Sequence, residues 1–175
     1  MILPPDLHED DLAIRRGLRE MLIGIRKEMG MYQWQLADQI GVARTAASHM
    51  EAKDNWRMNT IQRWAKGLSQ RLVLYPATVP PESSVYREVN LLRPIASDIE
   101  KFDREALLQL LVEARTLVPM TQREAGVLLG TGENGVGQLE HSPNMFLMMA
   151  QRYCRAIGTV LVIELWDKQD ELEAA

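Results

Sequence analysis

The chain has 175 residues, of which 46% are hydrophobic and 25% charged, and its formal net charge is −4. This length and composition suit one or two small globular domains with apolar cores. No apolar run approaches the ~20 residues of a membrane helix, and the acidic start MILPPDLHEDD is unlike a basic secretory signal, so we expect no membrane association and a cytoplasmic location.

Residue types that build catalytic or metal sites are few and scattered. Cys154 is the one cysteine, and its apolar helical setting favours a buried small side chain over a nucleophile. His8, His49 and His141 show no metal-ligand spacing. No glycine loop followed by lysine, pair of acids with a plausible pocket or Ser/His/Asp order can be placed on the chain. We therefore expect neither an enzyme nor a metal or other cofactor.

Charge is distributed unevenly along the chain. Residues 15–71 hold eleven bases and five acids, whereas residues 1–14 hold four acids and no base. Residues 72–103 hold three bases and five acids, and residues 104–175 hold six bases and ten acids. A polyanionic partner would therefore be attracted to residues 15–71.

The first predicted element is a long helix over roughly residues 11–29, ended by Gly30. It is indicated by apolar residues that recur on one face. These residues are Leu12, Leu18, Leu22 and Ile25.

Two short helices joined by a tight turn are predicted next, between Gln33 and Glu51. Apolar residues recur at helical spacing as far as Gly41, which can adopt a positive φ and end the first helix. A second helix should begin near Ala43 and turn Ala47 inward with Met50. The apolar residues of the first helix are Trp34, Leu36, Ala37 and Ile40. The outer face of the second presents groups suited to base edges in a major groove, namely Arg44, Thr45, Ser48 and His49.

This segment, QWQLADQIGVARTAASHME, resembles the helix-turn-helix of the lambda-repressor/Cro family. The resemblance lies in the opening Gln, the central Leu-Ala, the Gly-Val turn and a Glu 18 residues after that Gln. It implies that the first helix lies across phosphates while the second reads bases. It also implies a structural ion pair between Arg26 and Glu51. The phosphate contacts that it implies come from Gln33, Lys53, Asn55 and Arg57. The alternative is a helix pair that binds a protein or serves structure alone.

The segment after the helix pair should complete the bundle and lead into a connector. Trp56 is expected to fill the core, and a helix over residues 59–69 should close the bundle. The run RLVLYPA, residues 71–77, predicts a short strand. A linker helix rich in apolar residues should follow Ser83 or Ser84 and end before Pro94.

The second half repeats the first at a shift of 89 residues. Phe102 and Asp103 should form a hydrophobic staple and N-cap for the matching first helix. The residue pairs related by the shift are Arg26 and Arg115, Met31 and Met120, Gln33 and Gln122, Gly41 and Gly130, Glu51 and Glu140. The sequence therefore predicts a mainly α protein with two helix-turn-helix bundles, in domains 1–70 and 103–175, joined by a strand and helical linker over 71–102.

The second recognition segment, TGENGVGQLE at residues 131–140, departs from the family pattern. It contains three glycines, each costing up to about 1 kcal/mol of helix stability relative to alanine. Phe146 stands where the first copy has Arg57. Tentative DNA contacts in this copy are Gln122, Glu133, Asn134 and Gln138. Two alternatives are open: a weaker base-reading module, or a degenerate domain kept for packing.

Two such domains in one chain resemble the immunity repressors of temperate phages, particularly mycobacteriophages. We therefore expect a sequence-specific transcriptional repressor that binds double-stranded DNA.

Strands 72–75 and 160–165 should pair within one chain, so that a monomer binds a non-palindromic operator. The alternative assembly is a homodimer on an inverted repeat. The alternative function is an antitoxin-like or adaptor module that binds protein, which exposure of Met145, Phe146, Met148 and Met149 would support.

Overall fold

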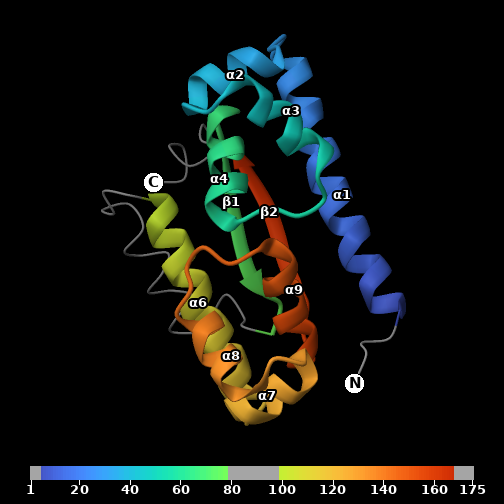
Figure 1. Ribbon diagram of the computed structural model, residues 1–175, viewed down its shortest axis with the longest axis vertical. Helices are drawn as coiled ribbons and strands as arrows, with labels where there is room; N and C mark the ends of the chain where they lie inside the picture. Colours follow the sequence, from blue (N-terminus) through green and yellow to red (C-terminus); the bar gives the residue numbers. More distant parts are fainter. Residues whose placement is uncertain (1–4, 79–98, 168–175) are drawn as a thin grey trace. The chain divides into compact units, whose positions relative to one another are not determined.

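The computed structural model describes residues 5–78 and 99–167, which form a mainly helical protein with one small antiparallel sheet (Figure 1). The elements before the gap are α1 (Pro5–Glu28), α2 (Gln33–Ile40), α3 (Arg44–Ala52), α4 (Met58–Gly67) and β1 (Gln70–Pro76). Those after it are α6 (Ile99–Leu117), α7 (Gln122–Leu129), α8 (Gly132–Glu140), α9 (Leu147–Ala156) and β2 (Leu161–Asp167). The predicted linker helix after Ser83 lies outside the described residues.

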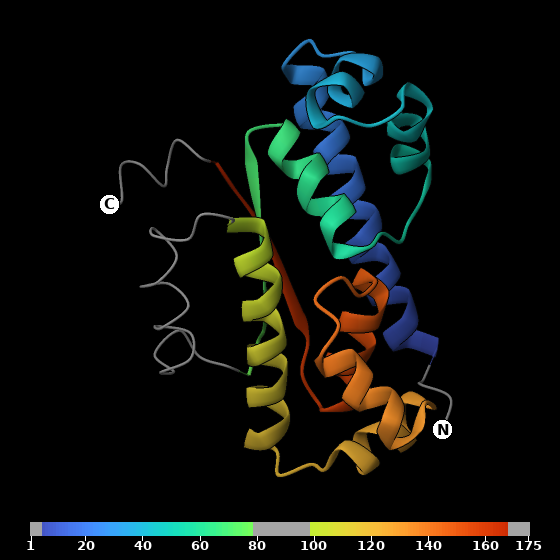
Figure 2. The same ribbon diagram turned by 60° about the vertical axis from the view of Figure 1, so that its left-hand side comes forward.

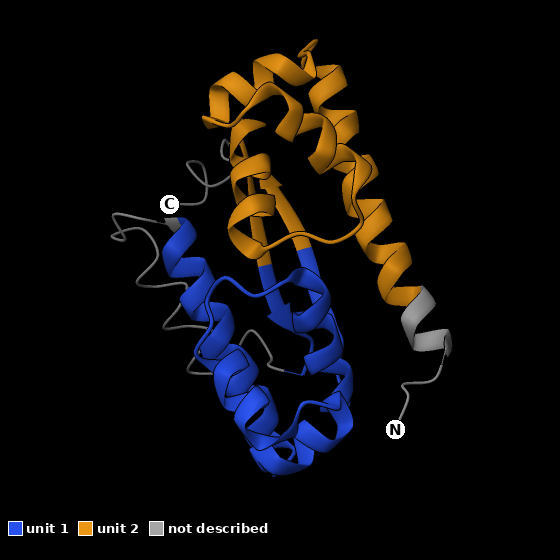
Figure 3. Ribbon diagram, viewed as in Figure 1, with its two compact units in different colours: residues 1–3, 74–163 blue, residues 4–73, 164–175 orange. Residues whose placement is uncertain are grey.

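The described residues divide into two compact units, coloured separately in Figure 3. Unit 2 contains residues 5–73 and 164–167, and unit 1 contains residues 74–78 and 99–163. The described part of each unit has four helices, and α1 to α4 of unit 2 correspond in order to α6 to α9 of unit 1. This order matches the 89-residue repeat seen in the sequence.

Strands β1 and β2 form the two-stranded sheet and run side by side in both views (Figures 1 and 2). The Ala77 N–H donates to the Val160 carbonyl at 2.9 Å just beyond the strand ends. The predicted pairing of the two strands within one chain is therefore confirmed. Since the unit boundary crosses the sheet, residues 70–73 and 164–167 belong to unit 2 and the remainder of each strand to unit 1.

The core of unit 2 forms around one face of α1. Leu18 and Leu22 of the predicted apolar stripe are buried. The helix begins at Pro5, earlier than predicted from the apolar stripe alone. Trp56 is buried as expected, and its indole N–H donates to the Met50 carbonyl at 2.9 Å, so the polar atom of this large side chain is satisfied.

The core of unit 1 contains Cys154, which is buried as predicted. The prediction that Asp103 caps the first helix of this unit is wrong, because α6 begins at Ile99 and already includes that residue. No helix-breaking residue separates Ile99 from Asp103, and an ion pair between Lys101 and Glu105, 3.8 Å long and four residues apart, supports the extra turn. Within residues 5–78 and 99–167, no helix combines the length and apolar character that crossing a membrane requires.

Candidate nucleic-acid interface

The helix pair α2–α3 is joined by a turn whose geometry follows from glycine. Gly41 adopts φ 68°, in the left-handed region, and the Val42 N–H then donates to the Ala37 carbonyl at 3.0 Å. Helix α3 begins at Arg44, as the sequence predicted to within a residue. Its inner face is buried through Ala47 and Met50.

The outer face of α3 consists of exposed hydrogen-bonding side chains. The Ser48 hydroxyl donates to the Thr45 carbonyl at 3.2 Å, so its oxygen is oriented and retains capacity to accept. All four residues predicted to read bases are exposed: Arg44, Thr45, Ser48 and His49. Side chains of these types can form hydrogen bonds with base edges.

The tryptophan of α2 lies outside the core of unit 2. Leu36 and Ala37 are buried, but Trp34 is 46% exposed. Gln33, one turn before Leu36, takes the half-buried position instead and is held by a hydrogen bond to Glu51. Trp34 is therefore directed outward at the start of α2.

A buried ion pair fastens α3 to the rest of unit 2. Arg26 on α1 donates from Nε to Glu51 Oε1 at 2.6 Å, from Nη2 to Glu51 Oε2 at 3.1 Å and from Nη1 to the Met31 carbonyl at 2.6 Å. The side chains of Arg26 and Glu51 are only 9% and 8% exposed. Gln33 Nε2 adds a bond of 2.7 Å to Glu51 Oε2. The Gln33 amide, which was predicted to contact phosphate, thus already donates one of its hydrogens to this network.

The loop after α3 is anchored by arginines of α1 that the sequence reasoning missed. Arg15 Nε donates to the Asp54 carbonyl at 2.7 Å, and Arg19 forms an ion pair with the Asp54 carboxylate. Arg16 Nε lies 3.5 Å from the same carboxylate. Three arginines within five residues of one helix were the available signal. In the loop itself Lys53 and Arg57 are exposed and Asn55 is half-buried.

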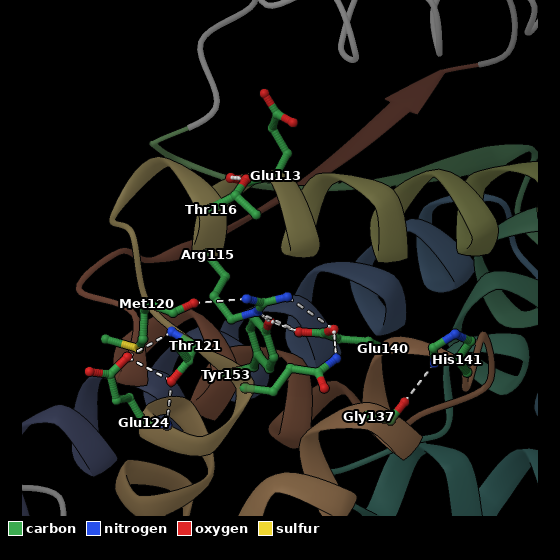
Figure 4. Close-up of polar contacts among 11 residues, drawn as sticks. Glu113, Arg115, Thr116, Met120, Thr121, Glu124, Gly137, Glu140, His141 and Tyr153 are labelled. Carbon is green, nitrogen blue, oxygen red and sulfur yellow. Dashed lines mark hydrogen bonds and ion pairs between the residues drawn. The ribbon is translucent and has the colours of Figure 1, made fainter.

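The pair α7–α8 repeats this design in unit 1. Gly130 adopts φ 71° and the Thr131 N–H donates to the Gly126 carbonyl at 3.0 Å. Thr121 caps α7: its hydroxyl accepts from the Glu124 N–H at 3.2 Å, while Glu124 Oε2 accepts from the Thr121 N–H at 2.8 Å (Figure 4). These bonds from the backbone and hydroxyl of Thr121 lower the pKa of Glu124.

The ion pair is also repeated in unit 1, bond for bond (Figure 4). Arg115 donates from Nε to Glu140 Oε1 at 2.7 Å, from Nη2 to Oε2 at 3.3 Å and from Nη1 to the Met120 carbonyl at 2.8 Å. Gln122 Nε2 donates to Glu140 Oε2 at 2.7 Å. The Arg115 and Glu140 side chains are 12% and 4% exposed. The repeat found in the sequence therefore extends to individual hydrogen bonds.

Tyr153 on α9 joins the second network and has no counterpart in the first. Its hydroxyl donates to Glu140 Oε1 at 2.5 Å and accepts from Arg115 Nε at 3.2 Å. The shift of 89 residues places Tyr153 on Trp64, whose buried indole nitrogen has no hydrogen-bond partner among the described residues. The difference between tryptophan in the first repeat and tyrosine in the second was the sequence signal for Tyr153.

The charges of the second network are held in place by their neighbours. Burial opposes ionisation of Glu140, but hydrogen bonds from Arg115, Tyr153 and Gln122 outweigh it and lower the pKa of this carboxyl. The hydrogen bond to Glu140 raises the pKa of Arg115, although burial opposes the shift. Burial, followed by the hydrogen bond to the carboxylate, raises the pKa of the Tyr153 hydroxyl. The ionised pair with a neutral tyrosine is therefore the stable form at neutral pH.

Glycines in and before α8 serve close packing within unit 1. A Cβ on Gly126 would meet the carbonyl carbon of Gly132 at 2.4 Å, so α7 approaches the backbone of α8 where the first copy has Ala37. A Cβ on Gly135 would meet Thr131 Cβ at 2.6 Å. Gly137 has only an ordinary contact at 3.9 Å. Of the three α8 glycines noted in the sequence, Gly135 therefore makes a close contact inside the unit, whereas Gly132 has open space around it but adopts φ 71°.

The outer face of α8 is exposed but differs chemically from that of α3. Glu133, Asn134 and Gln138 are exposed and Gly137 is half-buried. This face offers amides and a carboxylate where α3 offers an arginine, hydroxyls and an imidazole. Of the residues that would support protein binding by this unit, Met145 is buried, Phe146 is exposed, and Met148 and Met149 are half-buried.

Residues that could ligate a metal ion lie apart in the described part of the chain. There, no three or more His, Cys, Asp or Glu side chains gather where they could hold one. No family model, curated protein or solved structure matches the chain. The chemistry of the exposed side chains therefore carries the functional proposal.

Proposed function

We propose that this chain is a sequence-specific repressor that binds double-stranded DNA through helix-turn-helix units of the lambda-repressor/Cro type, and that it serves the immunity of a temperate phage. The supporting observation is α3, which buries Ala47 and Met50 while exposing its four candidate base-reading side chains. The phage role rests on the resemblance in architecture stated from the sequence.

The chemistry of the α3 face suits base readout. Arginine donates two hydrogen bonds to O6 and N7 of guanine, and the hydroxyls of Thr45 and Ser48 can donate to or accept from several bases. The Arg26–Glu51 ion pair supports this function because it fixes α3 against α1 and α2 before DNA arrives. Less ordering is then left to the binding step, which favours affinity.

Cations beside α3 provide the phosphate contacts in this proposal. Lys53 and Arg57 are exposed in the loop that follows α3, and Arg16 of α1 lies beside this loop through Asp54. Each phosphate neutralised by such a side chain releases counterions, so affinity should fall as salt rises. We assign recognition of the DNA sequence to the α3 face, and sequence-independent affinity to this loop.

Site selection from random double-stranded DNA, followed by titration of single variants, tests the proposal. Arg44→Ala should cost about 1–3 kcal/mol on the selected site and relax preference at one or two base pairs. Lys53→Ala should weaken binding to all sequences and flatten the salt slope. Arg63→Ala is the matched control, since it removes an exposed cation from α4 of the same unit. Equal effects of Arg44→Ala and Arg63→Ala would sink the proposal.

The two outer faces differ, so we propose that one chain binds a non-palindromic operator. Residues 44–49 read RTAASH and residues 133–138 read ENGVGQ, which should prefer different bases. Light scattering of the complex on a minimal site should give the mass of one chain. A mass of two chains together with a palindromic selected sequence would instead support the homodimer.

A protein-binding role is the second candidate, and it concerns unit 1. The observations that favour it are the exposed Phe146 and Val127 and the lack of a cation on the α8 face, within the described residues. Asn134→Ala and Gln138→Ala decide between the two. If α8 reads bases, these variants should relax preference at positions that Arg44→Ala leaves intact. If the selected sequence is unchanged, unit 1 packs or binds protein.

A further inference from the structure

An exposed aromatic stack lies at the start of α2. The rings of Tyr32 and Trp34 are nearly parallel, at 9°, with centroids 6.4 Å apart, and the two residues are 66% and 46% exposed. Two other tryptophans of the same unit, Trp56 and Trp64, are buried in the core. Because burial is the ordinary way to stabilise so large an apolar side chain, a function outside the core is the better account of the exposed pair.

The aromatic stack lies directly beneath the first base-reading residue. The guanidinium carbon of Arg44 lies 5.3 Å from the centroid of the Trp34 ring, within the range of a cation–π contact. Asp38 Oδ2 lies 3.6 Å from Arg44 Nη2, but both side chains are largely exposed, so this ion pair is weak. Stacking on a ring leaves the edge of the guanidinium plane free to donate hydrogen bonds.

The second repeat does not contain this arrangement. The shift of 89 residues places Arg123 on Trp34, Val127 on Asp38 and Glu133 on Arg44. The aromatic platform therefore accompanies the arginine and is replaced where the arginine is replaced. That correspondence links Trp34 to the particular chemistry of Arg44 rather than to the shared fold.

We infer that Trp34 is a positioning residue that fixes the guanidinium plane of Arg44 for a guanine edge, and thereby sets the preference for guanine at one position of the operator. This inference rests on the proposed function. A free arginine must lose side-chain freedom when it binds, whereas a stacked arginine has lost part of it beforehand. Guanine gains most from the pre-oriented plane because it offers two acceptors in the groove, O6 and N7.

The test compares Trp34→Leu with Trp34→Phe on two versions of one DNA site. The relevant guanine is the base at which Arg44→Ala relaxes preference, and the second version carries 7-deazaguanine there, which lacks N7. Trp34→Leu should weaken binding to the guanine site about two- to fivefold, the effect of an exposed cation–π contact. It should have a smaller effect on the 7-deazaguanine site, which keeps the O6 acceptor, and no effect in an Arg44→Ala background. Trp34→Phe keeps an aromatic face and should stay close to the wild type.

Controls separate this inference from the proposed function and from folding. Met21→Ala removes another exposed apolar side chain of the same unit and should change nothing. Since Trp34 lies outside the core, its variants should unfold at the wild-type temperature. Three results with Trp34→Leu would overturn the inference alone. They are an equal loss of binding on both DNA versions, an undiminished loss in the Arg44→Ala background, and a changed preference at a base pair where the operator has no guanine. Failure of the wild-type chain to bind any selected DNA would overturn the proposed function, and the inference with it.

Discussion

Replacing Glu51 by alanine tests how strongly the buried ion pair stabilises unit 2. The substitution removes both bonds that Arg26 makes to the carboxylate and the bond from Gln33, and leaves the guanidinium with its 2.6 Å bond to the Met31 carbonyl. Arg26 is nearly inaccessible to water, so its charge becomes an uncompensated buried one. Breaking such a pair typically costs about 3–5 kcal/mol. Against a total stability of roughly 5–15 kcal/mol, this loss is large.

Urea unfolding followed by tryptophan fluorescence measures this loss in the intended unit. All four tryptophans of the chain, residues 34, 56, 64 and 166, belong to unit 2. With a urea dependence of about 1–3 kcal/mol per molar, the midpoint of Glu51→Ala should fall by more than about 1 M. Glu28→Ala, which removes an exposed carboxylate from α1, is the control and should stay within about 0.5 kcal/mol of the wild type.

A second variant separates the cost of an unpaired buried charge from the cost of the missing hydrogen bonds. Replacing Arg26 and Glu51 together by apolar residues of similar size removes both charges, and such exchanges are often neutral or stabilising. The double variant should therefore be more stable than Glu51→Ala. A melting temperature of Glu51→Ala within a degree or so of the wild type would refute the reasoning, since about 1 kcal/mol alone shifts a domain of this size by several degrees.

Two further predictions concern unit 1. Tyr153→Phe should cost about 1.5–3 kcal/mol, the range for a hydrogen bond to a charged group, and raise the pKa of Glu140. The pKa of Glu140 is depressed in the folded wild type, so its contribution to stability should be complete above about pH 4.3, the ordinary value of a glutamate, and lost as pH falls through the lower folded value. Titration of the wild-type Glu140 carboxyl by NMR checks this, and a pKa at the ordinary value or higher would contradict it. Gly126→Ala should destabilise the unit by about 1–3 kcal/mol because its Cβ overlaps the Gly132 backbone. Gly137→Ala, in open helix, should stabilise it by up to about 1 kcal/mol; equal thermal midpoints for the two variants would show that the close approach is unimportant.

Local sequence signals predicted the helix pairs well because single residues determine their ends. Gly41 and Gly130 both adopt the left-handed conformation that ends α2 and α7, and a shift of 89 residues relates the two. The start of α6 was mispredicted because a good N-cap residue, Asp103, is also tolerated inside a helix when the residues before it continue the helical pattern. Helix propensity alone does not determine whether Asp103 caps the helix or lies inside it.

For the candidate interface, the sequence predicted which side chains of α3 are exposed but not the contacts around them. The exposed face of α3 follows from helical periodicity, whereas the outward position of Trp34 depends on Gln33 taking the half-buried place beside Glu51. The anchoring of Asp54 by α1 joins residues 35 to 39 positions apart; the cluster of arginines in α1 signals an anionic partner but does not say which residue that partner is. The role of Tyr153 becomes visible only when the two repeats are compared.

The division of the sheet between the two units affects the order in which the chain can fold on the ribosome. Strand β1 contributes residues 70–73 to unit 2, but their partners at 164–167 are synthesised after the whole of unit 1. At about 5–20 residues per second, the roughly 90 intervening residues delay that pairing by about 5–20 s. During this interval the edge of β1 has hydrogen-bonding groups open to any other strand. A β2 strand of a second molecule that pairs with β1 in this interval gives a strand-exchanged dimer with the same strand pairing.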